Sequence, residues 1–277
     1  MKRKILNPDK IHPAVITVWA AIVASVHLIP TIPMIGGNFF TFASIITPLS
    51  GILFGPLAGA LCSAAGGLIG SLIAPHSASF GIASFIPGTI TAFTAGCIAW
   101  GRWPLLKINR VGSFVVNGGI IIYLIGIILW FSHETGRNFP IKIIIYYSIG
   151  LAALFIGSIF SKKMLPGKFH FLQFLICWLC ALGGLVGGAT MGNYLALALF
   201  KDIGWDFVLL IAPIERAIFA AGTALIGVPL LAGLNKVGIR LGPKPFKEDT
   251  PPPPAEKKAE DAQYTLLPAP AEDKPAG

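Results

Sequence analysis

Residues 29–70 read IPTIPMIGGNFFTFASIITPLSGILFGPLAGALCSAAGGLIG. The apolar runs at 41–55 and 57–74 are separated only by Gly55-Pro56. A bilayer core of roughly 30 Å takes about 20 apolar residues in a helix. Because backbone groups in hydrocarbon need partners within their own segment, and no alternating strand pattern is present, the sequence predicts that all such runs are helices.

Similar runs recur along the chain and set its fold class. Gly55-Pro56 marks either a tight helical hairpin or a kink, so the expected number of spans is eight, with six as the alternative. The sequence therefore predicts an all-α polytopic membrane protein, a bundle of about eight transmembrane helices within residues 14–233. The runs lie at about 14–34, 41–55, 57–74, 80–100, 111–131, 141–160, 171–200 and 207–233.

The composition excludes several other classes of protein. The chain is 55% hydrophobic and 12% charged, whereas soluble domains carry about 25% charged residues. A soluble globular fold and a disulfide-stapled secreted domain are thereby excluded. The pI near 9.5 does not indicate nucleic-acid binding, because the basic residues lie between apolar runs and not on one face.

The short loops place most of their positive charge on one side. If the N-terminus is cytoplasmic, twelve Lys and Arg lie inside, against Arg137, Lys142 and Lys201 outside. Since Lys and Arg accumulate on the cytoplasmic side, both termini are expected there. No small-residue cleavage site follows the basic N-terminus, so the first helix is expected to be retained. The cytoplasmic segments would be 1–13, 101–110, 161–170 and 234–242.

The end of the chain differs from the rest. Residues 234–242 are a basic juxtamembrane segment, and residues 243–277 contain nine prolines mixed with Lys, Glu, Asp and Ala. Such a composition cannot bury a core, so a disordered, solvated tail is expected. A docking peptide is the alternative function for it.

Small residues at a spacing of four mark faces where helices in lipid approach closely. The first helix carries Ala20 and Ala24 in this register, and Ala21 and Ser25 follow one residue later. Packing within the chain is the default interpretation, and a docking face for a partner on the first helix is the alternative. Two further stripes are Gly55, Gly59, Ser63 and Gly184, Gly188, Gly192.

Ionisable residues inside a membrane are costly and indicate function. Glu215 and Arg216 are adjacent, about 100° apart on a helix, so both cannot face one partner squarely. Arg216 could bind a carboxylate or phosphate of a ligand, and Glu215 could accept a hydrogen bond from an amine or hydroxyl. The alternative is a polar clamp between helices. His27 is expected to be a packed, hydrogen-bonded histidine.

The outer loops add further polar and aromatic groups. Candidate binding residues there are Asn38, Phe40, Thr41 and His76, and Asn193 approaches the same side on the seventh helix. Polar groups that converge among aromatics suit a small amphipathic organic solute. The alternative is that they are ordinary exposed loop residues. The same two alternatives apply to His133, Glu134 and Arg137.

Several chemistries lack their sequence patterns. The four cysteines lie inside apolar runs, and Cys177-x-x-Cys180 has no second pair, so no zinc or other metal site is expected. No phosphate-binding loop, HExxH, GxSxG or paired carboxylates occur. We therefore expect no enzymatic activity and no cofactor.

Two stretches resemble a known family. Residues 29–70 combine a glycine- and aromatic-containing loop, a Pro-bearing helix, a Phe-Gly-Pro hinge and a Gly/Ala-rich helix. Residues 211–236, IAPIERAIFAAGTALIGVPLLAGLNK, carry a Pro near their start and a Val-Pro near their end. Both are similar to the substrate-binding (S) components of energy-coupling-factor (ECF) vitamin transporters.

The resemblance implies a subunit in the plasma membrane of a prokaryotic cell that captures a vitamin-like solute outside. It implies a membrane coupling subunit and two cytoplasmic ATPase subunits as partners, docking through Ala20 and Ala24. Residues 37–41 would cover the site, and Asn193, Glu215 and Arg216 would lie near it. Family members typically have six helices, so residues 101–170 would add two. The N-terminus lacks the family's metal-binding pattern, which favours an organic solute.

Two other functions remain open from the residues alone. A stand-alone secondary carrier could use Glu215 as a proton site, although no clear internal repeat is present. A membrane sensor or adaptor is the third possibility, but the tail holds no signalling domain. The identity of the solute is not determined by the sequence.

Overall fold

The computed structural model describes residues 13–33, 39–100, 118–161, 171–200, 203–236 and 241. All of them belong to one compact unit, Met1–Lys244. Several predictions lie outside the described residues: those for the basic N-terminus up to residue 12, for Asn38, for most basic loop residues and for the tail at 243–277.

The described part of the chain is almost entirely helical. Five of its helical segments are long and apolar enough to cross a membrane. This confirms an all-α chain of membrane type. The elements in order are α1 (Pro13–Val26), β1 (Pro30–Pro33), β2 (Phe39–Thr41), α2 (Ala43–Phe54), α3 (Pro56–Ile73), η1 (Pro75–Ser77), η2 (Gly81–Ser84), α4 (Phe85–Trp100), α5 (Gly118–Ser132), α6 (Glu134–Arg137), α7 (Pro140–Phe160), α8 (Phe171–Leu199) and α9 (Trp205–Lys236).

Each of the eight predicted apolar runs contains one of these helices. Three of them are shorter than the others: α1, α2 and α5 have 14, 12 and 15 residues. At 1.5 Å per residue these three are roughly 18–22 Å long, less than the thickness of a bilayer core. Length alone therefore assigns five spanning helices.

The segment after the first helix differs from the prediction of one continuous helix. Helix was expected up to residue 34, but α1 ends at Val26, and β1 pairs with β2 in an antiparallel hairpin. Pro30 and Pro33 are the physical reason, because a proline inside a helix lacks the N–H group and clashes with the preceding turn. The expectation that every apolar run is wholly helical was wrong here.

The break at Gly55-Pro56 is a sharp turn between two separate helices. Gly55 has φ of 84°, a left-handed conformation that favours glycine, and Pro56 is the first residue of α3. A Cβ built at Gly59 would lie 2.5 Å from the Ser50 carbonyl oxygen, so the backbones of α2 and α3 approach closely. Of the two alternatives that the sequence left open, the structure has the tight turn between two helices and not the kink.

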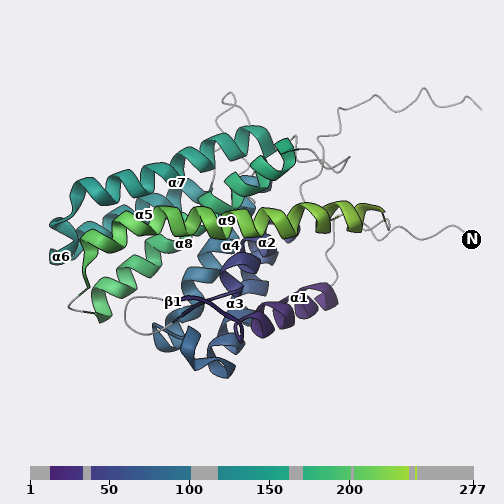
Figure 1. Ribbon diagram of the computed structural model, residues 1–277, viewed down its shortest axis with the longest axis horizontal. Helices are drawn as coiled ribbons and strands as arrows, with labels where there is room; N and C mark the ends of the chain where they lie inside the picture. The colour runs from purple at the N-terminus through teal and green to yellow at the C-terminus, as the bar shows by residue number, and fades with distance from the viewer. Residues whose placement is uncertain are drawn as a thin grey trace, which may run out of the picture. The chain divides into compact units, whose positions relative to one another are not determined.

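Helices α4 and α8 form the centre of the bundle, and α5, α7 and α9 pack against α8 (Figure 1). The predicted glycine stripe on α8 faces α4. A Cβ at Gly184 would lie 2.6 Å from the Ala95 Cβ, and one at Gly188 would lie 2.5 Å from the Pro87 carbonyl oxygen. Glycine is required at these points because the two backbones are too close for side chains between them.

Helix α1 lies beside α3, as Figure 1 also shows. Ala20 and Ala24 are buried, and a Cβ at Gly66 of α3 would lie 2.5 Å from the Ala20 carbonyl oxygen. The alanine pair therefore packs within the chain, as the default interpretation held. Ala21 and Ser25, one residue later, are exposed.

Candidate solute-binding site

A cavity of about 590 Å³ lies at the end of the bundle where α2, α4 and α9 begin and α8 ends. The β1–β2 hairpin forms one of its walls, and the turn around η1 contributes another part. These segments come together because the short connections between consecutive helices return the chain to the same end. The volume falls within the range of about 300–1,000 Å³ that is typical of small-molecule sites.

Glu215 and Arg216 lie on the wall formed by α9, two and three residues after Pro213. Their side chains are only 14% and 15% exposed. The nearest approach between them, from Arg216 Nη1 to Glu215 Oε1, is 3.9 Å, which is too long for a hydrogen bond. The two adjacent side chains therefore form an ion pair without a hydrogen bond between these atoms.

Both charged groups retain unused hydrogen-bonding capacity. Arg216 Nε and Glu215 Oε1 are buried and have no hydrogen-bond partner among the described residues. The buried Tyr146 of α7 is the other group that interacts electrostatically with Arg216. Because an unsatisfied buried donor or acceptor is costly, such atoms at a cavity wall are suited to bind a ligand.

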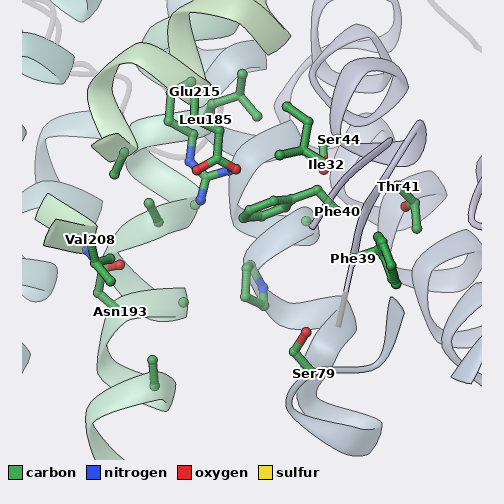
Figure 2. A pocket seen from close by; sticks show the side chains of 18 of the residues that line it. Ile32, Phe39, Phe40, Thr41, Ser44, Ser79, Leu185, Asn193, Val208 and Glu215 are labelled. Carbon is green, nitrogen blue, oxygen red and sulfur yellow. The ribbon is translucent and has the colours of Figure 1, made fainter. Parts of the chain in front are cut away.

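The hairpin places an aromatic ring against the arginine. The Arg216 guanidinium carbon lies 4.8 Å from the centroid of the Phe40 ring, a cation–π contact. Phe40 also packs edge to face on Phe219 of α9, with centroids 5.5 Å apart. Thr31 Oγ1 donates a hydrogen bond of 2.9 Å to the Phe40 carbonyl oxygen across the hairpin. In Figure 2 the Phe40 ring points toward Glu215.

On the opposite wall, Asn193 of α8 is held by a tyrosine. Asn193 Nδ2 donates to Tyr147 Oη over 3.5 Å, and Tyr147 is buried. Asn193 lies across the space from Phe40 in Figure 2. Asn193 thus adds a polar side chain to this wall of the cavity.

Five of the seven residues predicted to bind the solute line this single cavity: Phe40, Thr41, Asn193, Glu215 and Arg216. The sixth, His76, is not among the lining residues, although its neighbour Ser77 is. Asn38 lies outside the described residues.

Of the other histidines in the described part of the chain, His27 lines the cavity. Its Nδ1 lies 2.7 Å from the Val23 carbonyl oxygen, which confirms the expected packed, hydrogen-bonded histidine. His133, Glu134 and Arg137 are not among the lining residues. Instead, His133 Nδ1 accepts a hydrogen bond from Thr135 N at the start of α6.

Sequence reasoning missed several lining residues. Trp205, Phe200 and Phe207 lie around the turn between α8 and α9, and Thr47 and Thr91 lie within helices. Aromatics at helix ends are frequent at any membrane interface, so they gave no specific signal. Threonines inside helices commonly donate a hydrogen bond to a backbone carbonyl group of the preceding turn. Whether such a side chain also faces a cavity is seen only once the helices are packed together.

The arrangement of the lining residues is suited to binding a small molecule. In the described part of the chain, no group of three or more His, Cys, Asp or Glu side chains could hold a metal ion. The four cysteines are buried thiols. The cavity instead combines an apolar lining with a few polar groups, as small-molecule sites do.

Comparison of the chain with models of protein families, with curated proteins and with solved structures finds no match.

Proposed function

We propose that the chain is the substrate-binding S component of an energy-coupling-factor transporter and takes up a small, vitamin-like organic micronutrient. The observation that carries this proposal is the cavity of about 590 Å³, in which Arg216, Glu215 and Phe40 converge beneath a hairpin. It is large enough to enclose a solute, and its charged groups have unused hydrogen-bonding atoms.

The proposed topology has eight membrane spans, with both termini in the cytoplasm of a prokaryotic cell. The excess of Lys and Arg in alternate loops supports this orientation. The cavity end of the bundle would then face outside, where a solute for uptake is captured. In bacterial cells, a C-terminal green fluorescent protein fusion should fluoresce, and a C-terminal alkaline phosphatase fusion should be inactive. An active phosphatase would overturn the orientation.

The proposed partners are a membrane coupling subunit and two cytoplasmic ATPase subunits. The chain has no phosphate-binding loop, so energy for uptake would come from those subunits. The tagged protein should be purified from its native membrane in mild detergent, and co-purifying proteins and retained small molecules identified by mass spectrometry. Recovery of a coupling subunit, two ATPases and an organic solute is expected. Recovery of the chain alone from active cells would overturn the assignment.

Glu215 favours a second candidate, a proton-coupled carrier that works alone. Its Oε1 is buried at the cavity without a hydrogen-bond partner, as a proton-accepting carboxylate would be. A carrier would move its solute in proteoliposomes without other subunits and respond to an imposed pH gradient. The S-component proposal expects no net transport in that preparation.

A further inference from the structure

We infer that the solute is a small organic acid that carries an N–H or O–H donor on the carbon beside its carboxylate and has an apolar body. This inference rests on the proposed binding role of the cavity. It narrows the solute to one chemical class, of which an α-amino acid or an α-hydroxy acid with a ring-sized side chain is the simplest form.

The first requirement comes from Arg216. Its guanidinium is held by the Phe40 ring at 4.8 Å, but its Nε has no hydrogen-bond partner, and its Nη1 is 3.9 Å from Glu215 Oε1. The aromatic contact helps to position the guanidinium and leaves its Nε–H donor unused. A carboxylate matches such a fork with two parallel charge-assisted hydrogen bonds, which neither a neutral carbonyl nor an amine can provide.

The second requirement comes from Glu215. Its Oε1 accepts no hydrogen bond, so a ligand group that faces it must donate one. Parallel or converging hydrogen bonds of about 2.8 Å to two protein atoms that are 3.9 Å apart place the ligand's acceptor and donor about 4 Å or less from each other. Groups on neighbouring carbons meet this spacing, whereas groups at opposite ends of a long molecule do not.

Charge balance narrows the class further. Glu215 and Arg216 are the only Asp, Glu, Lys or Arg among the described residues that line the cavity. Their charges cancel, so a headgroup that is neutral overall, a carboxylate beside an ammonium, is accommodated best, and a carboxylate beside a hydroxyl adds a single negative charge. A phosphate ester would bring nearly two negative charges next to Glu215, and a simple amine would leave Arg216 without an anion.

The remainder of the cavity determines the body of the solute. Away from α9, the lining contains aromatic and aliphatic residues such as Phe40, Pro87 and Leu185, with serine and threonine residues between them. A volume of about 590 Å³ accepts a ring-sized body together with the headgroup. Asn193 provides one further polar contact on the opposite wall for a substituent of that body.

Four phenyl compounds of nearly equal size test the headgroup. L-Phenylalanine carries both groups, 3-phenylpropanoate only the acid, phenethylamine only the amine, and 3-phenylpropanamide neither charge. Their dissociation constants are measured by calorimetry with the full chain in nanodiscs. We expect phenylalanine to bind about ten-fold more tightly than phenylpropanoate, and phenylpropanoate about ten-fold more tightly than the amide or the amine.

Variants assign each preference to one residue. Arg216→Gln should abolish the preference for the acid over the amide, and Glu215→Gln should abolish the preference for phenylalanine over phenylpropanoate. Arg137→Gln, which changes an arginine outside the cavity, is the matched control and should retain both preferences. If Arg216→Gln does not fold, Arg216→Lys keeps the charge without the fork and should still weaken acid binding.

Three results overturn the inference: equal binding of the amide and the acid, tightest binding of the amine, or no binding of any probe at 10 mM. Co-purification of the coupling and ATPase subunits is independent of these probes. If the subunits are recovered but the probes fail, the solute class is wrong and the proposed function stands. If the probes bind and the subunits are absent, the proposed function fails and the solute class stands.

Discussion

Two glycines one helical turn apart on α8 give a direct test of the close contact at the centre of the bundle. A Cβ at Gly188 would lie 2.5 Å from the Pro87 carbonyl oxygen, whereas the nearest atom to a Cβ at Gly192 is Pro87 Cγ, at 3.7 Å. Gly188→Ala therefore creates a clash with backbone, and Gly192→Ala makes an ordinary van der Waals contact. The two variants add the same methyl group to the same helix.

The expected magnitudes follow from these distances. Ordinary contact begins at 3.4 Å, so the Pro87 carbonyl oxygen must move away from Gly188 by about 0.9 Å, and the Thr91 hydroxyl, which is nearer still, must move as well. Overpacking of this kind costs about 1–3 kcal/mol in a close-packed interior. At Gly192 the exchange of glycine for alanine is neutral or stabilises the helix by up to about 1 kcal/mol.

The assay is thermal unfolding in detergent, followed by tryptophan fluorescence. For a chain of this size, about 1 kcal/mol shifts Tm by roughly 2–4 °C. Gly188→Ala should therefore lower Tm by about 2–12 °C, and Gly192→Ala should leave it unchanged or slightly raised. Equal Tm values for the two variants, or a higher Tm for Gly188→Ala, would refute the close α4–α8 contact.

Three further predictions concern packing and charge outside the cavity. Trp19→Phe removes the 2.8 Å hydrogen bond from Trp19 Nε1 to the buried Ser50 Oγ and should cost about 1–2 kcal/mol, measured as a lower Tm than the wild type; an unchanged Tm would contradict it. Lys142→Ala breaks the ion pair with Asp206, whose two side chains are 48% and 70% exposed, so the free energy of unfolding should change by less than about 1 kcal/mol. A larger loss of stability would contradict this prediction. Ala20→Leu should destabilise the chain because Ala20 is buried against α3, whereas Ala21→Leu, on the exposed face, should leave Tm unchanged; equal effects would contradict the α1–α3 packing.

The helices were predictable because their signal is long and redundant. A run such as 141–160 contains so many apolar residues that its exact ends hardly matter, and the observed α7 spans Pro140–Phe160. The β1–β2 hairpin was missed because its strands have four and three residues, too few to show a period of two. Pro30 and Pro33 did indicate that the helix ends before them, but a proline is compatible with both an edge strand and a loop.

The site was predictable where a residue is costly in its surroundings. Glu215 and Arg216 stand out in an apolar run because a charge there must have a partner or a role. Trp205 does not stand out, since tryptophan is common at the ends of membrane helices. Trp205 lines the cavity, and its ring centroid lies 5.0 Å from that of Trp130. This position depends on how α5 and α9 pack, which no local sequence pattern encodes.

The corner between α2 and α3 has a consequence for how this chain can evolve. A Cβ at Gly96 would lie 2.6 Å from Pro56 N, a Cβ at Gly55 would touch the Trp100 ring at 3.4 Å, and Trp100 Nε1 donates to the Ile52 carbonyl oxygen over 3.1 Å. The residue at each of these positions therefore restricts which residue types can occupy the positions that it contacts. Descendants of this sequence should replace them together or not at all, so substitutions at this corner should covary while the lipid-facing positions drift independently.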